Sequence, residues 1–119
     1  MDATAKAHFQ RCGPRKVNQV CTVIRGKSVA LAQAALPTAR RTAKTLVEKT
    51  LRSAAANLAV RLGHPVFLGK IYIKSAWVGQ GPMRPLRRIR PAPMGRAMTF
   101  KRKMCHLTVI VTDTLNGKA

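Results

Sequence analysis

Residues 81–106 read GPMRPLRRIRPAPMGRAMTFKRKMCH, and this stretch decides the fold of the chain. It contains eight cationic side chains and no carboxylate. The cations are Arg84, Arg87, Arg88, Arg90, Arg96, Lys101, Arg102 and Lys103. Pro85, Pro91 and Pro93 lack the backbone donor that a continuous β ladder requires. The stretch therefore has almost no apolar face to bury, and its order must come from what surrounds it.

A period-two pattern on both sides of this stretch predicts two strands. In KIYIKSAWV, residues 70–78, one face holds Ile71, Ile73 and Trp77, and the other holds Lys70, Tyr72 and Lys74. In MCHLTVIVTD, residues 104–113, one face holds Cys105, Leu107, Val109 and Val111, and the other holds His106, Thr108 and Thr112. Antiparallel pairing of the two strands turns residues 79–104 into a hairpin arm, whose tip stands about 30 Å beyond the sheet.

Three helices are predicted before these strands. The first is PRKVNQVCTVIRG, with Pro14 in its first turn. Its apolar stripe consists of Val17, Val20, Cys21 and Ile24. A short second helix, SVALAQAAL, is capped by Ser28 and ends before Pro37. The third, TARRTAKTLVEKTLRSAAANLAVRLG, runs from a Thr38 cap to Gly63.

These elements predict a single α+β domain over residues 1–119. Three helices pack on a small antiparallel sheet, and a long β-hairpin arm protrudes from it. The body spans about residues 5–79 and 104–113, and the extended hairpin spans about residues 79–104. Both termini are expected to be short and flexible.

The charge of the chain implies an anionic partner. Twenty-three Lys and Arg residues face only three Asp and Glu residues, so the net charge is +20 in 119 residues. Such self-repulsion opposes compaction unless a polyanion neutralises it. Nucleic acid is the first candidate, because phosphate contacts release condensed counterions. An anionic membrane is the second, but the apolar runs are far shorter than the roughly 20 residues of a spanning helix, and no signal peptide is visible.

The third helix carries a basic surface opposite its apolar stripe, formed by Arg40, Arg41, Lys44, Lys49 and Arg52. The net charge of +20 favours contact of this surface, and of the arm cations including Arg84, with RNA or DNA. A solvated helix face with Glu48 pairs is the alternative interpretation of the helix surface. For the arm, the alternative to an RNA-binding hairpin is a disordered basic loop or a nuclear-localisation run at residues 101–103.

Catalytic and metal sites are not expected, and neither is any cofactor. Asp2, Glu48 and Asp113 are poorly placed for acid–base work. The cationic chain favours low thiol pKa values, but Cys105 and the adjacent His106 point to opposite faces of a strand. No Cys-x-x-Cys pair exists, and Cys21 is interpreted as a core residue. Trp77 is interpreted as a core residue rather than as a platform for an unpaired base, whereas Tyr72 is better placed to touch RNA.

The ordered combination of PRKVNQVCTVIRGKSV, LRSAAAN, GPMRPLRRIRPAPMGRA and KRKMCHLTVIVTD closely resembles the universal large-subunit ribosomal protein family numbered twenty-two, of bacterial type. The resemblance covers about residues 5–113, and residues 87–97 are its most specific part. It implies a body on the solvent side of the large subunit. It also implies a hairpin that runs through ribosomal RNA to the polypeptide exit tunnel, a part in subunit assembly, and an effect of the tip on the response to macrolides.

The resemblance also implies which residues act. The matching RNA-binding positions around the first helix are Arg15, Lys16, Arg25 and Lys27, and Ser53 and Asn57 match a turn of the long helix. On the arm and its return the matches are Leu86, Arg87, Arg88, Arg90, Pro91, Gly95, Arg96, Lys101, Arg102, Lys103 and His106. The tunnel-lining tip is expected at Arg88, Ile89, Arg90, Pro91, Ala92, Pro93 and Met94. The arm is two residues longer than is usual in bacteria, with Met83-Arg84 as the insertion, and this departure affects the placement of the tip.

The expected partners are large-subunit ribosomal RNA, neighbouring ribosomal proteins and the nascent polypeptide, with no membrane and no homo-oligomer. The expected location is the large ribosomal subunit in the cytoplasm, or an organellar ribosome of bacterial type. One rival hypothesis is a free histone-like or chaperone-type nucleic-acid-binding protein. Another is a cationic membrane-active protein, which would need aromatic anchors on a basic helix that this sequence does not provide.

Overall fold

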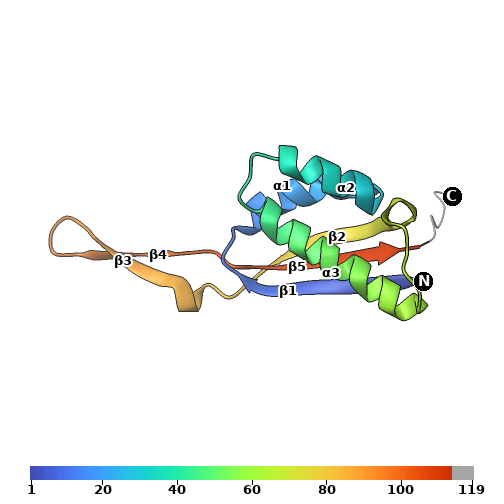
Figure 1. The fold of residues 1–119 in the computed structure, drawn as a ribbon. Helices are drawn as coiled ribbons and strands as arrows, with labels where there is room; N and C mark the ends of the chain where they lie inside the picture. The colour runs from blue at the N-terminus through green and yellow to red at the C-terminus, as the bar shows by residue number, and fades with distance from the viewer. Residues whose placement is uncertain (114–119) are drawn as a thin grey trace.

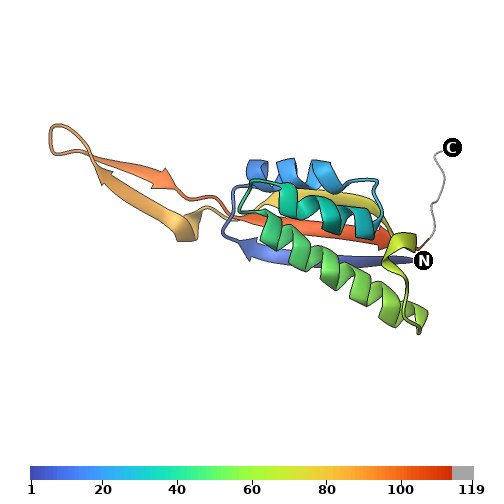
Figure 2. The same cartoon turned by 45° about the horizontal axis from the view of Figure 1, so that its top comes forward.

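The computed structural model describes residues 1–113 and shows an α+β fold. A three-stranded antiparallel sheet has the order β1-β5-β2, with β1 at Asp2–Gln10, β2 at Tyr72–Gln80 and β5 at Cys105–Thr112. Three helices, α1 (Pro14–Ile24), α2 (Val29–Ala35) and α3 (Lys44–Leu62), cover one face of this sheet (Figures 1 and 2). The predicted fold class is therefore confirmed.

A second sheet forms the arm, which projects from one end of the body (Figure 1). It consists of β3 (Arg87–Pro91) and β4 (Ala97–Lys101). The projection gives the molecule extents of 64 × 27 × 26 Å. The predicted β-hairpin is thus confirmed.

The central strand β5 supplies much of the core, as its period-two pattern predicts. Cys105, Leu107, Val109 and Val111 are fully buried beneath the helices. The matching surface of α1 is the predicted stripe of Val17, Val20, Cys21 and Ile24, which are all buried. On α3 the buried residues are Val47, Thr50, Leu51, Ala54, Ala55 and Leu58. Apolar burial between one strand face and two helix stripes is what holds the body together.

The strand β1 is absent from the sequence prediction, which assigned its first few residues to a flexible terminus and the residues from about 5 onward to the body. Its inward residues Ala3 and Ala5 are buried, and its pairs with β5 run from Asp2↔Thr112 to Gln10↔Cys105. Alanine has low strand propensity, so the alternating alanines give little signal. The expectation of a flexible C-terminus concerns residues beyond Asp113 and lies outside the described part of the chain.

The predicted core position of Trp77 is wrong. The pairing of β2 with β5 shifts register between Ile73 and Ser75, so one extra residue stands on β2. Beyond this bulge Ala76 takes the inward position and is buried, whereas Trp77 is 47% exposed. Trp77 pairs with Thr108, on the face of the sheet that the helices leave open.

The predicted starts and stops of the helices are partly confirmed. Ser28 caps α2 by accepting a hydrogen bond from the backbone N–H of Leu31 at 3.4 Å. Gly63 ends α3 in the left-handed conformation, with φ of +73°. The predicted Thr38 cap is wrong, because residues 36–38 form a short 3-10 turn, Ala39 is extended, and α3 begins only at Lys44. Residues 39–43 connect this turn to α3, which packs against the strands β1 and β5.

The connections between the body and the arm are unequal. Residues 81–86 lead from β2 to β3 and include the 3-10 turn Arg84–Leu86, whereas only residues 102–104 lead from β4 back to β5. Two backbone hydrogen bonds cross this junction, from Gly81 to the Met104 carbonyl at 2.8 Å and from Arg102 to the Leu86 carbonyl at 3.1 Å. A Cβ at Gly81 would lie 3.0 Å from the Met104 Cβ, so glycine permits this close approach.

Truncation of a core leucine tests the packing of the body. Leu51→Ala removes a fully buried side chain of α3 and is expected to lower the free energy of unfolding by about 2–5 kcal/mol. The matched variant Leu31→Ala removes a leucine of α2 that is 63% exposed, and its effect should stay within about 0.5 kcal/mol. Urea unfolding followed by circular dichroism measures both, and equal destabilisation of the two variants would contradict the packing described.

Candidate nucleic-acid interface

The arm has no hydrophobic core of its own. Every residue of β3 is exposed, and on β4 only Phe100 is partly covered. The guanidinium of Arg90 lies 4.5 Å from the centre of the Phe100 ring, and that of Arg102 lies 5.9 Å from it. These contacts are cation–π interactions, worth about 0.5–1 kcal/mol each at exposed sites. They align side chains on the ribbon but do not replace a core.

Cations occupy both faces of the arm. The register pairs Arg88 with Phe100 and Arg90 with Met98, so these side chains share one face. Arg87 pairs with Lys101 on the opposite face. A two-stranded ribbon with cations on both faces is suited to a partner that surrounds it, because a flat anionic surface would contact one face only.

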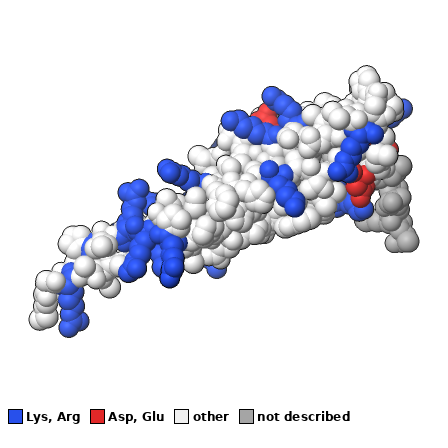
Figure 3. Space-filling model, turned by 90° about the horizontal axis from the view of Figure 1, so that it is seen from below, with Lys and Arg blue, Asp and Glu red and all other residues white. Residues whose placement is uncertain are grey.

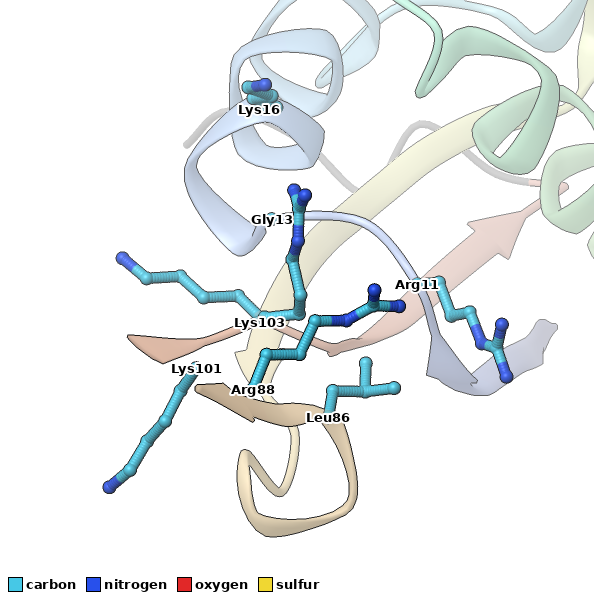
Figure 4. Close-up of a pocket in the computed structure, with 8 residues that line it drawn as sticks. Arg11, Gly13, Lys16, Leu86, Arg88, Lys101 and Lys103 are labelled. Carbon is cyan, nitrogen blue, oxygen red and sulfur yellow. The ribbon is translucent and has the colours of Figure 1, made fainter. Parts of the chain in front are cut away.

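A basic groove lies where the arm meets the body (Figure 4). This arm-base groove has a volume of about 540 Å³. It is lined by Arg11, Gly13, Lys16, Leu86, Arg88, Lys101, Arg102 and Lys103. Six of the eight lining residues are cations, drawn from three separate segments of the chain. Figure 3 shows Lys and Arg side chains gathered at this end of the molecule.

The three carboxylates of residues 1–113 are engaged on the body. Asp2 accepts a hydrogen bond from Lys74, which lowers the pKa of Asp2, and Asp113 pairs with the N-terminal amino group. Both lie at the end of the sheet remote from the arm (Figure 1). Glu48 pairs with Arg52 at 3.4 Å on α3. The cations of the arm are therefore not offset by any carboxylate on the arm itself.

The structure brings only some of the sequence-predicted RNA-binding residues together. Lys16, Arg88, Lys101, Arg102 and Lys103 line the arm-base groove. Arg84, Arg87, Arg90 and Arg96 lie elsewhere along the arm, in η3 (Arg84–Leu86), β3 and the turn before β4. Arg40, Arg41, Lys44, Lys49 and Arg52 lie apart from the groove, on α3 and the passage before it. Lys27 follows α1, and its carbonyl accepts a hydrogen bond from Ile73.

Two predicted site residues have structural contacts of their own. His106 accepts a hydrogen bond from the backbone N–H of Phe9 through Nδ1 at 3.0 Å, and its ring meets the Phe9 ring edge-on at 4.9 Å. Phe9 has a positive φ of 52°, at a bulge between Ala7 and Gln10. Asn57 donates from its side-chain amide to the Thr4 carbonyl at 3.1 Å. Both residues therefore hold β1 in place.

Arg11 is a groove residue that the sequence analysis did not identify. It follows β1, whose last pair, Gln10↔Cys105, brings it beside the start of β5 and hence beside the arm. Only a prediction that includes β1 in the sheet places Arg11 there. The run of basic residues around Pro14 was visible, but its position relative to the arm was not.

Cys21 and Cys105 do not have the low pKa values expected from the charge of the chain. Burial raises the pKa of Cys21 to about 11, and burial also raises the pKa of Cys105. At Cys21, desolvation of the thiolate outweighs the attraction of Arg25. Both thiols are therefore protonated at neutral pH, as small core residues would be. Within residues 1–113, no group of His, Cys, Asp and Glu is arranged to hold a metal ion.

Comparison with known proteins shows the family. The family model for ribosomal protein L22p/L17e matches residues 5–112. The chain belongs to this family. Its members are structural proteins rather than enzymes. None of the helices within residues 1–113 has the length and apolar character needed to cross a membrane.

Relatives named large ribosomal subunit protein uL22 match over nearly the whole chain. One from Endomicrobium trichonymphae is 43% identical over 113 residues, which cover 95% of this chain and 93% of the relative. One from Clostridioides difficile is 37% identical, with coverage of 95% and 98%. One from Myxococcus xanthus is 38% identical, with coverage of 95% and 97%. The ribosomal family resemblance seen in the sequence is thereby confirmed.

Amide hydrogen exchange tests the contrast between the arm and the body. In the free chain, the β3–β4 amides should exchange at least about 100-fold faster than those of β5, because an arm without buried residues opens at little cost in free energy. Exchange measured by NMR at physiological ionic strength gives both rates in one sample, and the β5 amides serve as the internal control. Protection of the arm equal to that of β5 would show that the ribbon is stable by itself.

Proposed function

We propose that the chain is a structural component of the large ribosomal subunit that binds large-subunit ribosomal RNA through its arm and arm-base groove, aids subunit assembly, and lines the polypeptide exit tunnel with its hairpin tip. One observation carries the proposal: a ribbon without a core projects from a member of a ribosomal protein family, within a stretch, residues 81–106, that holds eight cations and no carboxylate. Membership also places the chain in the cytoplasm, within the large subunit.

Folded RNA is the partner that suits this ribbon. Phosphates in a folded RNA surround an inserted element on several sides, and both faces of the arm present cations to them. The arm is richer in arginine than in lysine, and the planar guanidinium fork bonds phosphates in pairs and stacks on bases. The deep groove of A-form RNA hides its base edges, so recognition rests on shape and backbone.

The tip of the arm differs in chemistry from its shaft. The turn between the strands covers residues 92–96, with Met94 and Gly95 both at positive φ. The expected tip residues Arg88–Pro91 lie in β3, so the turn itself begins after them. Met94 is 93% exposed, and Arg96 is the only cation of the turn. A narrow, nearly uncharged end is suited to contact with a passing nascent chain rather than to a grip on phosphates.

A role in assembly follows from the same energetics. An isolated two-stranded ribbon is marginal in water, and the like charges of this ribbon repel one another. RNA that neutralises these charges orders the arm, and the arm in turn bridges RNA segments that would otherwise repel. Neighbouring ribosomal proteins and the nascent polypeptide are the further partners proposed, without a membrane partner or a second copy of the chain.

Sedimentation of cell lysate distinguishes this proposal from a free nucleic-acid-binding protein. A ribosomal component co-migrates with large subunits in a sucrose gradient at physiological salt. A histone-like or chaperone-type protein remains in light fractions as a soluble species, including after a high-salt wash. Recovery of the chain in light fractions only would overturn the proposal.

The arm-base groove predicts that two pairs of lysines differ in their effect on RNA binding. Lys101→Ala with Lys103→Ala removes two groove cations and should weaken binding to transcribed large-subunit RNA. The slope of log affinity against log salt should become shallower by about 0.7–0.9 for each phosphate that is no longer neutralised. Lys6→Ala with Lys70→Ala removes the same charge outside the groove and should change both quantities much less. Equal effects of the two pairs would show that only net charge matters.

Cross-linking tests the position of the tip. Met94→Cys places a thiol at the end of the arm, and Leu31→Cys places one at an exposed position on α2. In ribosomes that carry either variant, a stalled nascent chain with a thiol-reactive probe should cross-link to position 94 and not to position 31. Labelling at neither position would remove the tunnel-lining role from the proposal and leave RNA binding in place.

A further inference from the structure

We propose that Trp77 is a stacking platform for an unpaired base of large-subunit ribosomal RNA, in a groove along the outer edge of β2. This inference rests on the proposed RNA binding and names a second contact site, on the body rather than on the arm. The groove has a volume of about 280 Å³ and is lined by Pro14, Arg15, Asn18, Arg25, Trp77 and Val78. No carboxylate lines it.

The bulge in β2 is what makes the ring available. If the register of Ile73↔Val111 continued without the bulge, Trp77 would pair with Leu107 and point under the helices. With it, Trp77 remains 47% exposed on the outer strand β2, where it lines the groove together with residues of α1. Ala76 fills the inward position instead, so the core does not need the indole. An exposed ring of this size leaves a large apolar surface in water, which a stacked base would cover.

Arg25 gives the groove a fixed wall. Its Nε donates to the Ala76 carbonyl at 2.8 Å, and its Nη2 donates to the Asn18 side-chain oxygen at 2.7 Å. These two bonds hold the guanidinium beside the edge strand and satisfy a carbonyl of that edge. The cation is therefore positioned before any ligand arrives, so little side-chain entropy is lost on binding.

Arg15 supplies a cation for the adjoining phosphate. It is exposed in the first turn of α1 and lines the Trp77 groove, whereas its neighbour Lys16 lines the arm-base groove. The two grooves therefore adjoin at the first turn of α1. A single RNA strand that leaves the arm-base groove can place its next bases near Trp77 without crossing an anionic region.

A nucleobase fits this groove better than a protein segment does. Every base has a π-face, so stacking on an aromatic ring tolerates any sequence, and arginines beside the ring attract the attached phosphate. An acidic protein segment is the competing occupant, because its carboxylates would also be drawn to Arg15 and Arg25. A flat nucleobase stacks on the face of the indole, whereas a carboxylate side chain does not.

The fluorescence of Trp77 reports directly on stacking, because it is the only tryptophan of the chain. The full-length protein is titrated with transcribed large-subunit ribosomal RNA, with excitation at the red edge of tryptophan absorption so that Tyr72 does not contribute. Stacking is expected to quench the emission and to reduce the access of acrylamide to the ring. Trp77→Leu should weaken RNA binding by about 5- to 100-fold, and Trp77→Phe should restore binding to within about threefold of wild type.

Phe67→Leu provides the matched control, because Phe67 is another exposed ring of the body, 76% accessible, outside the groove. It should bind RNA as the wild type does. Circular dichroism of each variant verifies the fold. RNA binding without a change in emission would overturn the stacking site and leave the proposed function intact, and so would equal binding by Trp77→Leu. If an acidic protein segment occupies the groove instead, RNA binding should leave the Trp77 emission unchanged and Trp77→Leu should bind RNA as the wild type does. Failure of the wild type to bind RNA would overturn the proposed function itself.

Discussion

The backbone hydrogen bonds between β2 and β5 determine where the rest of the chain lies. They align residues 72–80 with residues 105–112, so everything between them must leave the sheet at one end. That intervening stretch is the most cationic in the chain and has nothing to bury. The arm is thus a product of strand pairing on one side and of the absence of apolar residues on the other. The same pairing makes β5 the central strand on which the helices rest.

Burial and charge are kept in different parts of the molecule. The body encloses Ala, Val, Leu, Ile and two buried cysteines, and it holds the three carboxylates of the described residues in contacts with cations. The arm holds its cations apart on two faces, with Phe100 as the one ring on which guanidinium groups rest. Apolar burial therefore stabilises the body, whereas the arm has no such core, and in the proposed function the surrounding RNA orders it.

The sequence predicts the fold well where one periodicity runs without interruption. The stripes of α1 and β5 are of this kind, and Gly63 and Ser28 end and begin helices as their chemistry requires. The prediction fails where a local event resets the pattern. A bulge after Ile73 moves Trp77 to the surface, an extended Ala39 delays the start of α3, and alternating alanines conceal β1.

Most residues of the candidate site could be predicted from the sequence, but their arrangement in space could not. The basic residues of the arm are evident from composition alone, yet their junction with Arg11 and Lys16 depends on the long-range pairing of β1, which a local pattern leaves undetermined.

The two connections between the body and the arm differ in length, so the longer one can gain or lose a residue with little loss of stability. Residues 81–86 oppose only residues 102–104, and the surplus is stored in a 3-10 turn that takes part in neither sheet. Gaining or losing a residue in that turn leaves both hydrogen-bonded registers as they are, because each is fixed by its own pairs. A change of length at this junction therefore alters the direction of the arm without altering the packing of the body, so the arm can adapt during evolution to a binding partner of different shape.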